Sequence, residues 1–367
     1  MSKLIESACL LLQKMYDPQQ ALFSYTTIVE NGIYQNDFSY PWSLRYTINS
    51  HLGLQEAQRN GFIEWDSQAE IDRFLALHEA QIKSAADQGL LLAAATRASS
   101  SAAGRIFQRV KQLTAQKSGL LELTLQDVSW LLLGLIEYSA STHSAEALST
   151  TEKLFQQVDR YFLNKDSMLP YYQLSAWRKP FSNFGGIVYF LQAFSEYARR
   201  LKSKYAEVIF RESVAKMIHL QGPNGEWPWF FNASSGVVAD YYPVYSVHQD
   251  SMAMLFLLPA VDLGVAGASQ AVEKSYRWLF GANQLGATMM VSAPEFFIYR
   301  CIHRRERLQR MRRYGRALLG WLTGGSARLA RPDQLEVLRH GRSYHPGWIL
   351  YAWASRTDFS EFTQLEL

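Results

Sequence analysis

The sequence predicts an all-α protein, an α/α toroid built of consecutive helical hairpins with long aromatic loops at one end. Apolar residues recur with the helical period of about 3.6 along most of the chain, and convincing alternating strands are absent from it. The helical runs come in successive pairs separated by Gly, Pro or Asn, as at 222–225 and 281–283. Antiparallel pairs of this kind can close into a ring of inner and outer helices, with a helical solenoid as the alternative. No linker divides the chain, so we expect a single domain over 1–367.

The first expected helix carries the apolar stripe Ile5, Cys9, Leu12 and Met15. Further helices are expected at 41–57, 68–83, 86–99, 104–117, 125–140, 143–163, 185–201, 203–220, 248–263, 268–281, 293–322, 333–340 and 346–356. Short extended pieces are expected only near Val237 and within 121–125. Each expected helix is thus followed closely by the next, as a ring of hairpins requires.

Composition limits the classes of function. The chain has 367 residues, of which 48% are hydrophobic, enough for a large buried core. Cys9 and Cys301 lie near opposite ends of the sequence, so neither a disulfide framework nor a metal-ligand spacing exists, and we expect no metal and no cofactor. The amino-terminal residues lack the pattern of a signal peptide, and the apolar run 128–136 is too short to span a bilayer. We therefore expect a cytoplasmic protein.

The loop 221–250 is the most informative segment, because it places acidic and aromatic residues between two helical runs. Its rings can stack on a sugar or enclose a hydrocarbon, and they include Trp227, Trp229, Tyr241 and Tyr242. Glu226 and Asp250 are the candidate acid and base, and His248 can take either role. The structural alternatives are that both tryptophans pack the loop, Glu226 faces water, and Asp250 caps the helix that follows.

Two further segments are expected at the same mouth. Arg45 and Tyr46 follow an aromatic turn, where an arginine can clamp a carboxylate or phosphate; the alternative is a structural ion pair with Asp37 or another acid. His345 lies in the Arg- and His-rich segment 339–348 and is expected at the rim. Asp127 heads a very apolar helix and is expected to act as a cap.

The formal net charge is +4, and the positive charge is concentrated in the segment 300–316, which holds eight arginines and a single acid, Glu306. This segment could bind an acidic glycan or the face of an anionic membrane, or it could be a solvated helix face. Nucleic acid is disfavoured as a partner because no nucleic-acid-binding signature is present. Oligomeric state is left open.

Two resemblances bear on fold and function. The stretch Gln221 to Trp227 resembles the Gln-x-x-x-Gly-x-Trp motif of terpene cyclases and protein prenyltransferases, which are α/α toroids. The segments 241–250 and 276–286, together with Ser43–Thr47 and Arg342–His345, resemble six-hairpin glycosidase-like and sugar-epimerase-like proteins, including bacterial proteins linked to surface-polysaccharide synthesis. These resemblances imply a toroid, and the second implies activity on sugars.

We therefore expect a carbohydrate-active protein, a glycosidase-, lyase- or epimerase-like enzyme whose substrate is a glycan, with an acidic glycan as one option. Asp250, Glu226 and His248 are the expected catalytic residues. The expected substrate-binding residues are Arg45, Tyr46, Trp227, Trp229, Tyr241, Tyr242 and His345. The alternatives are a non-catalytic helical module that binds a glycan or a partner, and an isoprenoid-cyclase-like toroid.

Overall fold

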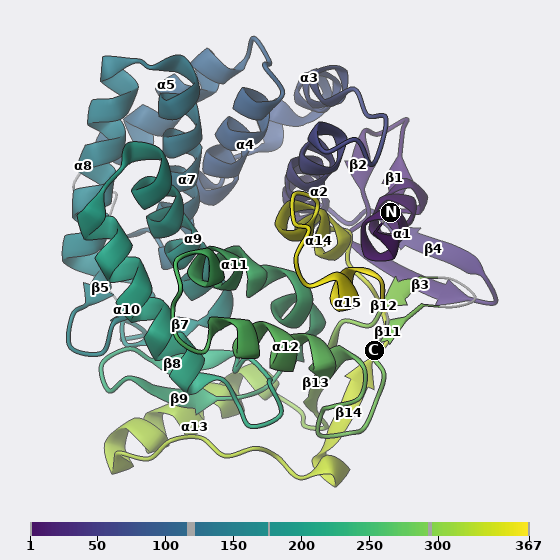
Figure 1. The fold of residues 1–367 in the computed structure, drawn as a ribbon, viewed down its shortest axis with the longest axis vertical. Helices are drawn as coiled ribbons and strands as arrows, with labels where there is room; N and C mark the ends of the chain where they lie inside the picture. Colours follow the sequence, from purple (N-terminus) through teal and green to yellow (C-terminus); the bar gives the residue numbers. More distant parts are fainter. Residues whose placement is uncertain (1, 116–121, 175–176, 293–295, 366–367) are drawn as a thin grey trace.

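The computed structural model describes residues 2–115, 122–174, 177–292 and 296–365. In this part of the chain, helices arranged in two concentric layers surround one axis (Figure 1). Neighbouring inner helices contact one another all the way round, and the last inner helix packs against the first, so the ring is closed. The predicted α/α toroid is therefore confirmed. The assignment of the whole chain to one domain stays a prediction.

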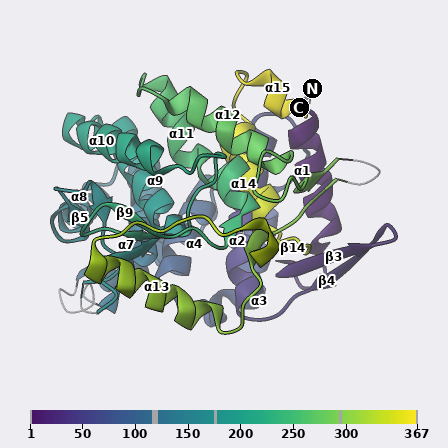
Figure 2. The same ribbon diagram turned by 90° about the horizontal axis from the view of Figure 1, so that it is seen from below.

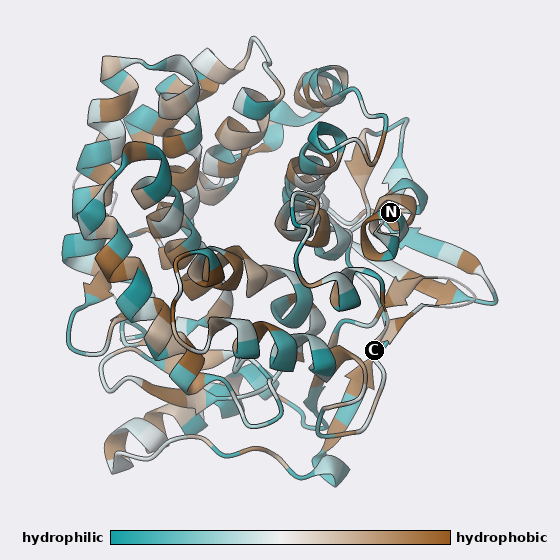
Figure 3. Cartoon of the chain, viewed as in Figure 1, coloured by the Kyte–Doolittle hydropathy of each residue, from teal (hydrophilic) through white to brown (hydrophobic). Residues whose placement is uncertain are grey.

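The inner layer contains α2 (Trp42–Arg59), α4 (Ala85–Arg97), α7 (Leu125–Thr142), α9 (Phe184–Leu201), α11 (Met254–Asp262) and α14 (Tyr344–Trp353). The outer layer contains α1 (Lys3–Lys14), α3 (Ser67–His78), α5 (Ala103–Ala115), α8 (Ala145–Phe162), α10 (Lys204–Leu220) and α12 (Ala268–Leu279). Five inner helices are followed in sequence by an outer helix, whereas α14 pairs with α1 from the other end of the chain. The inner helix α11, brown in Figure 3, is apolar nearly all round because it packs on several sides.

Two glycine contacts bring inner helices unusually close together. A Cβ atom on Gly89 of α4 would lie 2.4 Å from the Trp130 carbonyl group of α7, and one on Gly134 would lie 2.3 Å from the Gly89 oxygen. Similarly, a Cβ on Gly53 of α2 would lie 2.0 Å from the Gly347 oxygen of α14. Any side chain would force these backbones apart, so the glycines set the radius of the ring.

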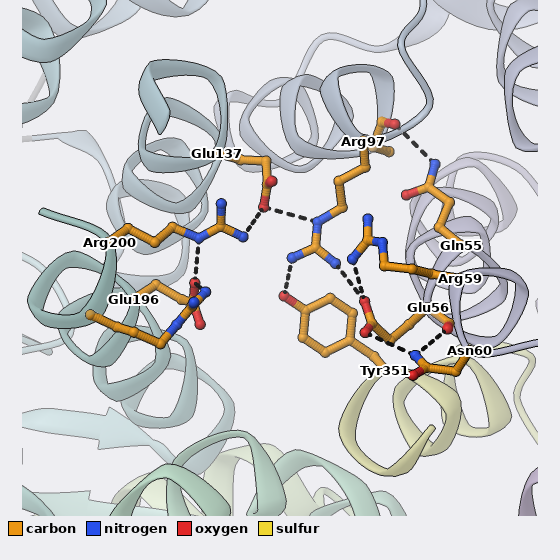
Figure 4. Close-up of polar contacts among 11 residues, drawn as sticks. Gln55, Glu56, Arg59, Asn60, Arg97, Glu137, Glu196, Arg200 and Tyr351 are labelled. Carbon is orange, nitrogen blue, oxygen red and sulfur yellow. Dashed lines mark hydrogen bonds and ion pairs between the residues drawn. The ribbon is translucent and has the colours of Figure 1, made fainter. Parts of the chain in front are cut away.

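The carboxyl-terminal ends of the inner helices are joined by a partly buried ion-pair network (Figure 4). Arg97 donates from Nε to Glu137 (2.9 Å), from Nη2 to the Tyr351 hydroxyl (2.9 Å) and from Nη1 to Glu56 (3.4 Å). Arg200 also donates to Glu137, at 3.0 Å. These residues come from α2, α4, α7, α9 and α14, so one network ties five inner helices together. Arginine near a helix carboxyl terminus also interacts favourably with the helix dipole.

The amino-terminal ends of the inner helices carry the long loops, and short antiparallel strands order them. The two-stranded sheets pair β1 (Tyr16–Asp17) with β2 (Leu22–Phe23), β3 (Thr26–Glu30) with β4 (Ile33–Asp37), β5 (Leu163–Asn164) with β6 (Leu169–Pro170), and β11 (Met290–Val291) with β12 (Phe297–Ile298). One three-stranded sheet has the order β7 (Phe181–Asn183), β8 (Phe230–Asn232), β9 (Val237–Asp240). The other has the order β10 (Val244–Tyr245), β13 (Cys301–Arg304), β14 (Leu335–Leu338). β7 leads directly into α9, and β10 precedes the π-helical turn His248–Met252 at the head of α11.

Several sequence expectations were wrong at this end of the ring. Strands were expected only near Val237 and within 121–125; β9 confirms the first, whereas the described residues 122–125 form no strand and contribute the isolated bridge of Thr124 with Gln173. The expected helix at 333–340 is a single 3-10 turn, Pro332–Gln334, followed by β14. The described part of the expected helix 293–322 contains β12, β13 and then α13 (Gln309–Thr323). Strands of two to five residues are too short to show alternation, and their pairing partners lie far away in sequence.

Candidate functional site

A cavity of about 260 Å³ opens among the amino-terminal ends of the inner helices and the loops above them. Its lining residues are Trp42, Arg45, Tyr46, Asn49, Gln126, Trp130, Asn183, Gly185, Tyr189, Trp229, Tyr245, His248, Met252, Arg300 and Tyr344. These side chains come from α2, α7, α9, the π-helical turn, α14 and the loops 221–250 and 300 onward. The ring therefore gathers aromatic and polar side chains that are up to 302 positions apart, from Trp42 to Tyr344, at one mouth.

His248 is the candidate base of this cavity. Its ring lies parallel to that of Trp229, with centroids 5.6 Å apart, and also packs on Phe184 (4.5 Å) and Tyr245 (5.0 Å). Burial, and then the neighbouring His345, lower the pKa of His248 well below its ordinary value. The imidazole is therefore neutral near pH 7, the form that accepts a proton. Its Nδ1 atom is buried and has no hydrogen-bond partner within the described structure.

Two arginines line the cavity and differ in their partners. Arg45 donates from Nε to Asp87 Oδ1 (2.5 Å) and from Nη2 to Asp87 Oδ2 (3.2 Å), so its charge is matched by a carboxylate. Arg300 instead donates from Nη1 to His340 Nε2 (3.0 Å), and it makes no ion pair with a described carboxylate. Burial, and then Arg342 and Arg300, lower the pKa of His340 to about 4, so this histidine does not compete with Arg300 as a cation.

Tyrosines form the remaining polar wall. Tyr46 packs between Tyr25 (5.5 Å) and Tyr344 (4.5 Å). Burial is the main cause that raises the pKa of Tyr46, Tyr189 and Tyr344, and for Tyr344 the pKa lies well above its ordinary value. These phenols therefore stay protonated across the physiological range and can donate a hydrogen bond or a proton.

Two more arginines beside the cavity lack a carboxylate partner in the described structure. Arg342 lies over the Tyr25 ring at 3.8 Å and donates to the Tyr25 carbonyl oxygen at 2.7 Å. Arg313 lies over the Trp229 ring at 5.7 Å. Burial is the main cause that lowers the pKa of both guanidinium groups, and Arg300 adds to it for Arg342. The cavity thus has an excess of positive charge that an anionic group could neutralise.

Asp250 and His345 were expected at the cavity, but neither is among its lining residues. Asp250 is fully buried, and His345 Nε2 lies 2.7 Å from its Oδ1 and 2.9 Å from its Oδ2. The Asp250 carbonyl oxygen accepts from Trp353 Nε1 at 2.6 Å. The expected cap was also wrong, because Asp250 lies within the π-helical turn and makes no cap hydrogen bond. The pair therefore links the π-helical turn to α14 in the core and does not line the cavity.

Glu226 and Trp227 also lie away from the cavity. Glu226 is fully buried rather than exposed to water and accepts a hydrogen bond from the Asn224 backbone N–H at 2.9 Å. Trp227 is fully buried and donates from Nε1 to Ser275 of α12 at 2.6 Å, while Gln221 donates to the Ala271 carbonyl oxygen at 3.1 Å. The segment 221–227 therefore fastens the end of α10 to α12.

Tyr241 and Tyr242 were also expected at the cavity, and the structure places both elsewhere. Tyr242 is buried beneath Arg304, whose guanidinium lies 4.9 Å from the ring centroid, and Tyr241 packs half-buried against the core. Both tyrosines follow directly after β9, and neither lines the cavity. Of the expected substrate-binding residues, the structure brings Arg45, Tyr46 and Trp229 to the cavity.

Asp127 was expected to cap α7; the N-cap is Thr124, and Asp127, three residues later, completes the capping box by accepting from the Thr124 backbone N–H at 2.9 Å. Its Oδ1 also accepts from the Ala86 backbone N–H at 3.3 Å, so it reaches the head of α4, close to Asp87. The lining residues Arg300, Tyr189 and Tyr344, and Asp87, which pairs with Arg45, were not predicted as site residues from the sequence. A signal was available for Asp87, because it lies in the first turn of an inner helix, as Arg45 does.

Within the described residues, no three His, Cys, Asp or Glu side chains gather in a way that could hold a metal ion. Among the described helices, none has the length and apolar character needed to cross a bilayer.

Comparison with known proteins identifies the fold. No protein-family model and no curated protein sequence matches the chain. A sugar epimerase from a ruminal bacterium matches in structure with a TM-score of 0.66 and 9% identity over 97% of both chains. Cellobiose 2-epimerase from Bacillus thermoamylovorans matches with a TM-score of 0.63 and 10% identity over 96% of this chain and 98% of the other.

An unsaturated glucuronyl hydrolase from Streptococcus agalactiae matches with a TM-score of 0.60 and 13% identity, over 96% of this chain and 89% of the other. The similarity extends over nearly the full length of each protein. The chain therefore has the α/α-toroid fold seen in these sugar enzymes.

Proposed function

We propose that the protein is an enzyme that acts on an acidic sugar or glycan by proton transfer at carbon, as an epimerase or a lyase does. The observation that carries the proposal is the composition of the cavity wall. The described lining residues include one neutral histidine, two arginines and four tyrosines, but no carboxylate. Glycoside hydrolysis ordinarily needs two carboxyl groups that flank the scissile bond. Similarity of fold to sugar epimerases and a glucuronyl hydrolase supports a sugar as the substrate.

In this proposal, His248 removes the proton from the carbon next to a carboxylate or carbonyl group of the sugar. The electron pair of the C–H bond moves into the neighbouring C–O group, and Arg300 stabilises the negative charge on the resulting oxygen. Epimerisation is completed when a tyrosine hydroxyl, such as that of Tyr189 or Tyr344, returns a proton to the opposite face. Elimination is completed when the bond to a β-oxygen breaks and a tyrosine protonates that leaving oxygen.

Isotope exchange tests the proposal. The protein is incubated in D₂O with a panel of uronic-acid oligosaccharides, and the recovered sugars are analysed by mass spectrometry and NMR. We expect deuterium at the carbon beside the carboxylate, or an unsaturated product, and a loss of about 10²–10⁴-fold in the rate for His248→Asn. His219→Asn, which changes an exposed histidine on α10, is the matched control and should keep full activity.

A second candidate function is glycoside hydrolysis, with Asp87 and Asp127 as the carboxyl pair. It is favoured by their position at the heads of the adjacent inner helices α4 and α7, beside Arg45. Hydrolysis in H₂¹⁸O would place ¹⁸O on the released sugar. Sugar release that needs Asp87 but survives His248→Asn would establish this function and reject proton transfer. Binding of the panel without any turnover would instead favour the non-catalytic binding module.

A further inference from the structure

The helix α13 lies at the edge of the molecule, along the end of the ring that carries the candidate site (Figures 1 and 2). Its inward side is well packed: Tyr314 meets Phe230 with ring centroids 5.3 Å apart, and Arg313 lies over Trp229, which lines the cavity. Ala317 is the one residue of α13 that is fully buried. The helix is therefore attached to the mouth of the cavity by a narrow stripe.

The outward side of α13 is apolar. The exposed fractions are 67% for Leu308, 70% for Met311, 64% for Leu319 and 70% for Leu322, and Leu318 adds 43%. Positions 308, 311, 318 and 322 recur with helical spacing and share one face with 319. This face points away from the inward residues Arg313 and Ala317. A typical amphipathic helix turns its apolar face toward the core, so the polarity of α13 is reversed.

Arginines surround this face. From residue 300 to residue 332 the chain holds ten arginines and a single acid, Glu306. Glu306 is already matched by Arg316, whose Nη2 donates to it at 2.9 Å. Arg307 and Arg310 are exposed and make no ion pair within the described structure. Trp321, half-exposed at 50%, lies in the last turn of the helix.

We propose that α13 is a membrane-surface helix that docks the protein on anionic phospholipid. Exposed leucines and methionine can enter the boundary between headgroups and acyl chains, and the flanking arginines can pair with lipid phosphates. Tryptophan favours the same interface because its ring is amphipathic. The absence of a spanning helix among the described residues fits a peripheral attachment. Docking through α13 brings the cavity beside the lipid headgroups, because Trp229 contacts the inward side of the helix. The proposal does not depend on the reaction assigned to the site.

Vesicle co-sedimentation tests this attachment with the full chain. Equimolar phosphatidylcholine and phosphatidylglycerol vesicles should bind the protein, whereas phosphatidylcholine vesicles should bind it weakly, and added salt should weaken the first interaction. Arg307→Gln with Arg310→Gln should lower the partition coefficient about fivefold for each arginine. Leu319→Ser with Leu322→Ser should lower it by roughly tenfold or more, because apolar area no longer enters the interface.

The matched control is Leu10→Ser, which changes a leucine on α1 that is 59% exposed and belongs to a different surface. It should bind anionic vesicles as the native chain does. Equal binding of both vesicle types, no binding to either, or unchanged binding by the Leu319/Leu322 variant would overturn the proposal. A second copy of the chain could bind the apolar face of α13 instead of a membrane, and sedimentation velocity detects such a dimer. A dimer that dissociates in the Leu319/Leu322 variant, without vesicle binding by the native chain, would also overturn it.

Discussion

His51 makes the stability of the toroid sensitive to acid. It lies on α2, fully buried, with its ring 5.6 Å from Phe23, 5.9 Å from Trp65 and 6.1 Å from Phe74. Neither ring nitrogen has a hydrogen-bond partner within the described structure. Burial lowers the pKa of His51 from 6.5 to about 3, because a charged imidazolium cannot be solvated among these rings.

The sign and size of the effect follow from proton linkage. The unfolded chain binds a proton on His51 as the pH falls through about 6.5, whereas the folded protein does not bind it until about pH 3. Folding must therefore release this proton, and the free energy of unfolding falls as the pH falls between these two values. From about pH 7 to about pH 5 the loss through His51 alone is about 2 kcal/mol.

The change His51→Leu removes this dependence while nearly conserving side-chain volume. Urea unfolding followed by circular dichroism should be measured near pH 7 and near pH 5 for both proteins. The native chain should lose about 2 kcal/mol more than the variant between the two conditions. His219→Leu controls for loss of an exposed histidine. Equal losses in the native protein and the His51→Leu variant would refute the reasoning.

Three further predictions concern packing and buried polar groups. Gly89→Ala should destabilise the ring by roughly 1–3 kcal/mol or prevent folding, because its Cβ meets the α7 backbone. Gly104→Ala should be tolerated, because the nearest atom to its Cβ lies at 3.8 Å. Thermal unfolding of the two variants tests this difference. Arg97→Met should cost about 1–3 kcal/mol in urea unfolding, because Glu137, Glu56 and the Tyr351 hydroxyl each lose a charged hydrogen-bond donor, although Arg200 and Arg59 still pair with the two glutamates. A cost as small as that of the exposed Arg59→Met would contradict the assigned network. Asp250→Ala should cost about 1–3 kcal/mol, because it leaves the buried His345 without its hydrogen-bond partner. Asp250→Asn keeps an acceptor oxygen and should retain most of the stability. Equal unfolding midpoints for the two variants would argue against a stabilising Asp250–His345 hydrogen bond.

The positions of the candidate residues separate what is local from what is tertiary. Arg45, Tyr46, Trp229 and His248 could be selected from the sequence because each lies in an aromatic segment near the start of an inner helix or in the loop before it. Once the ring closes, these segments necessarily meet at one end. The catalytic and binding roles of these residues stay predictions.

Glu226 and Asp250 show the limit of the same reasoning. Both are carboxylates beside aromatic residues, yet Glu226 belongs to the turn that fastens α10 to α12, and Asp250 is buried against His345 of α14. Neighbouring residues of a helix point in different directions, so a shift of one residue decides whether a side chain enters the cavity or the core. Sequence spacing does not predict this direction for Asp250, because the π-helical turn His248–Met252 departs from the α-helical repeat.

The sequence by itself determined the consecutive helical hairpins, because helical periodicity and hairpin punctuation are local properties that extend over most of the chain. Closure of the hairpins into a ring, rather than a solenoid, was decided by the packing of α14 against α2 and α1. Only the tertiary structure decided which side chains form the site. Arg300 and Tyr344 reach the cavity because β13 and β14 pair with β10 and because α14 packs against α2, and those contacts join segments far apart in sequence. The reversed polarity of α13 was decided in the same way. Its sequence shows an apolar stripe among arginines, but only the packing of Ala317 and Tyr314 on the loop sheet shows that the stripe faces outward.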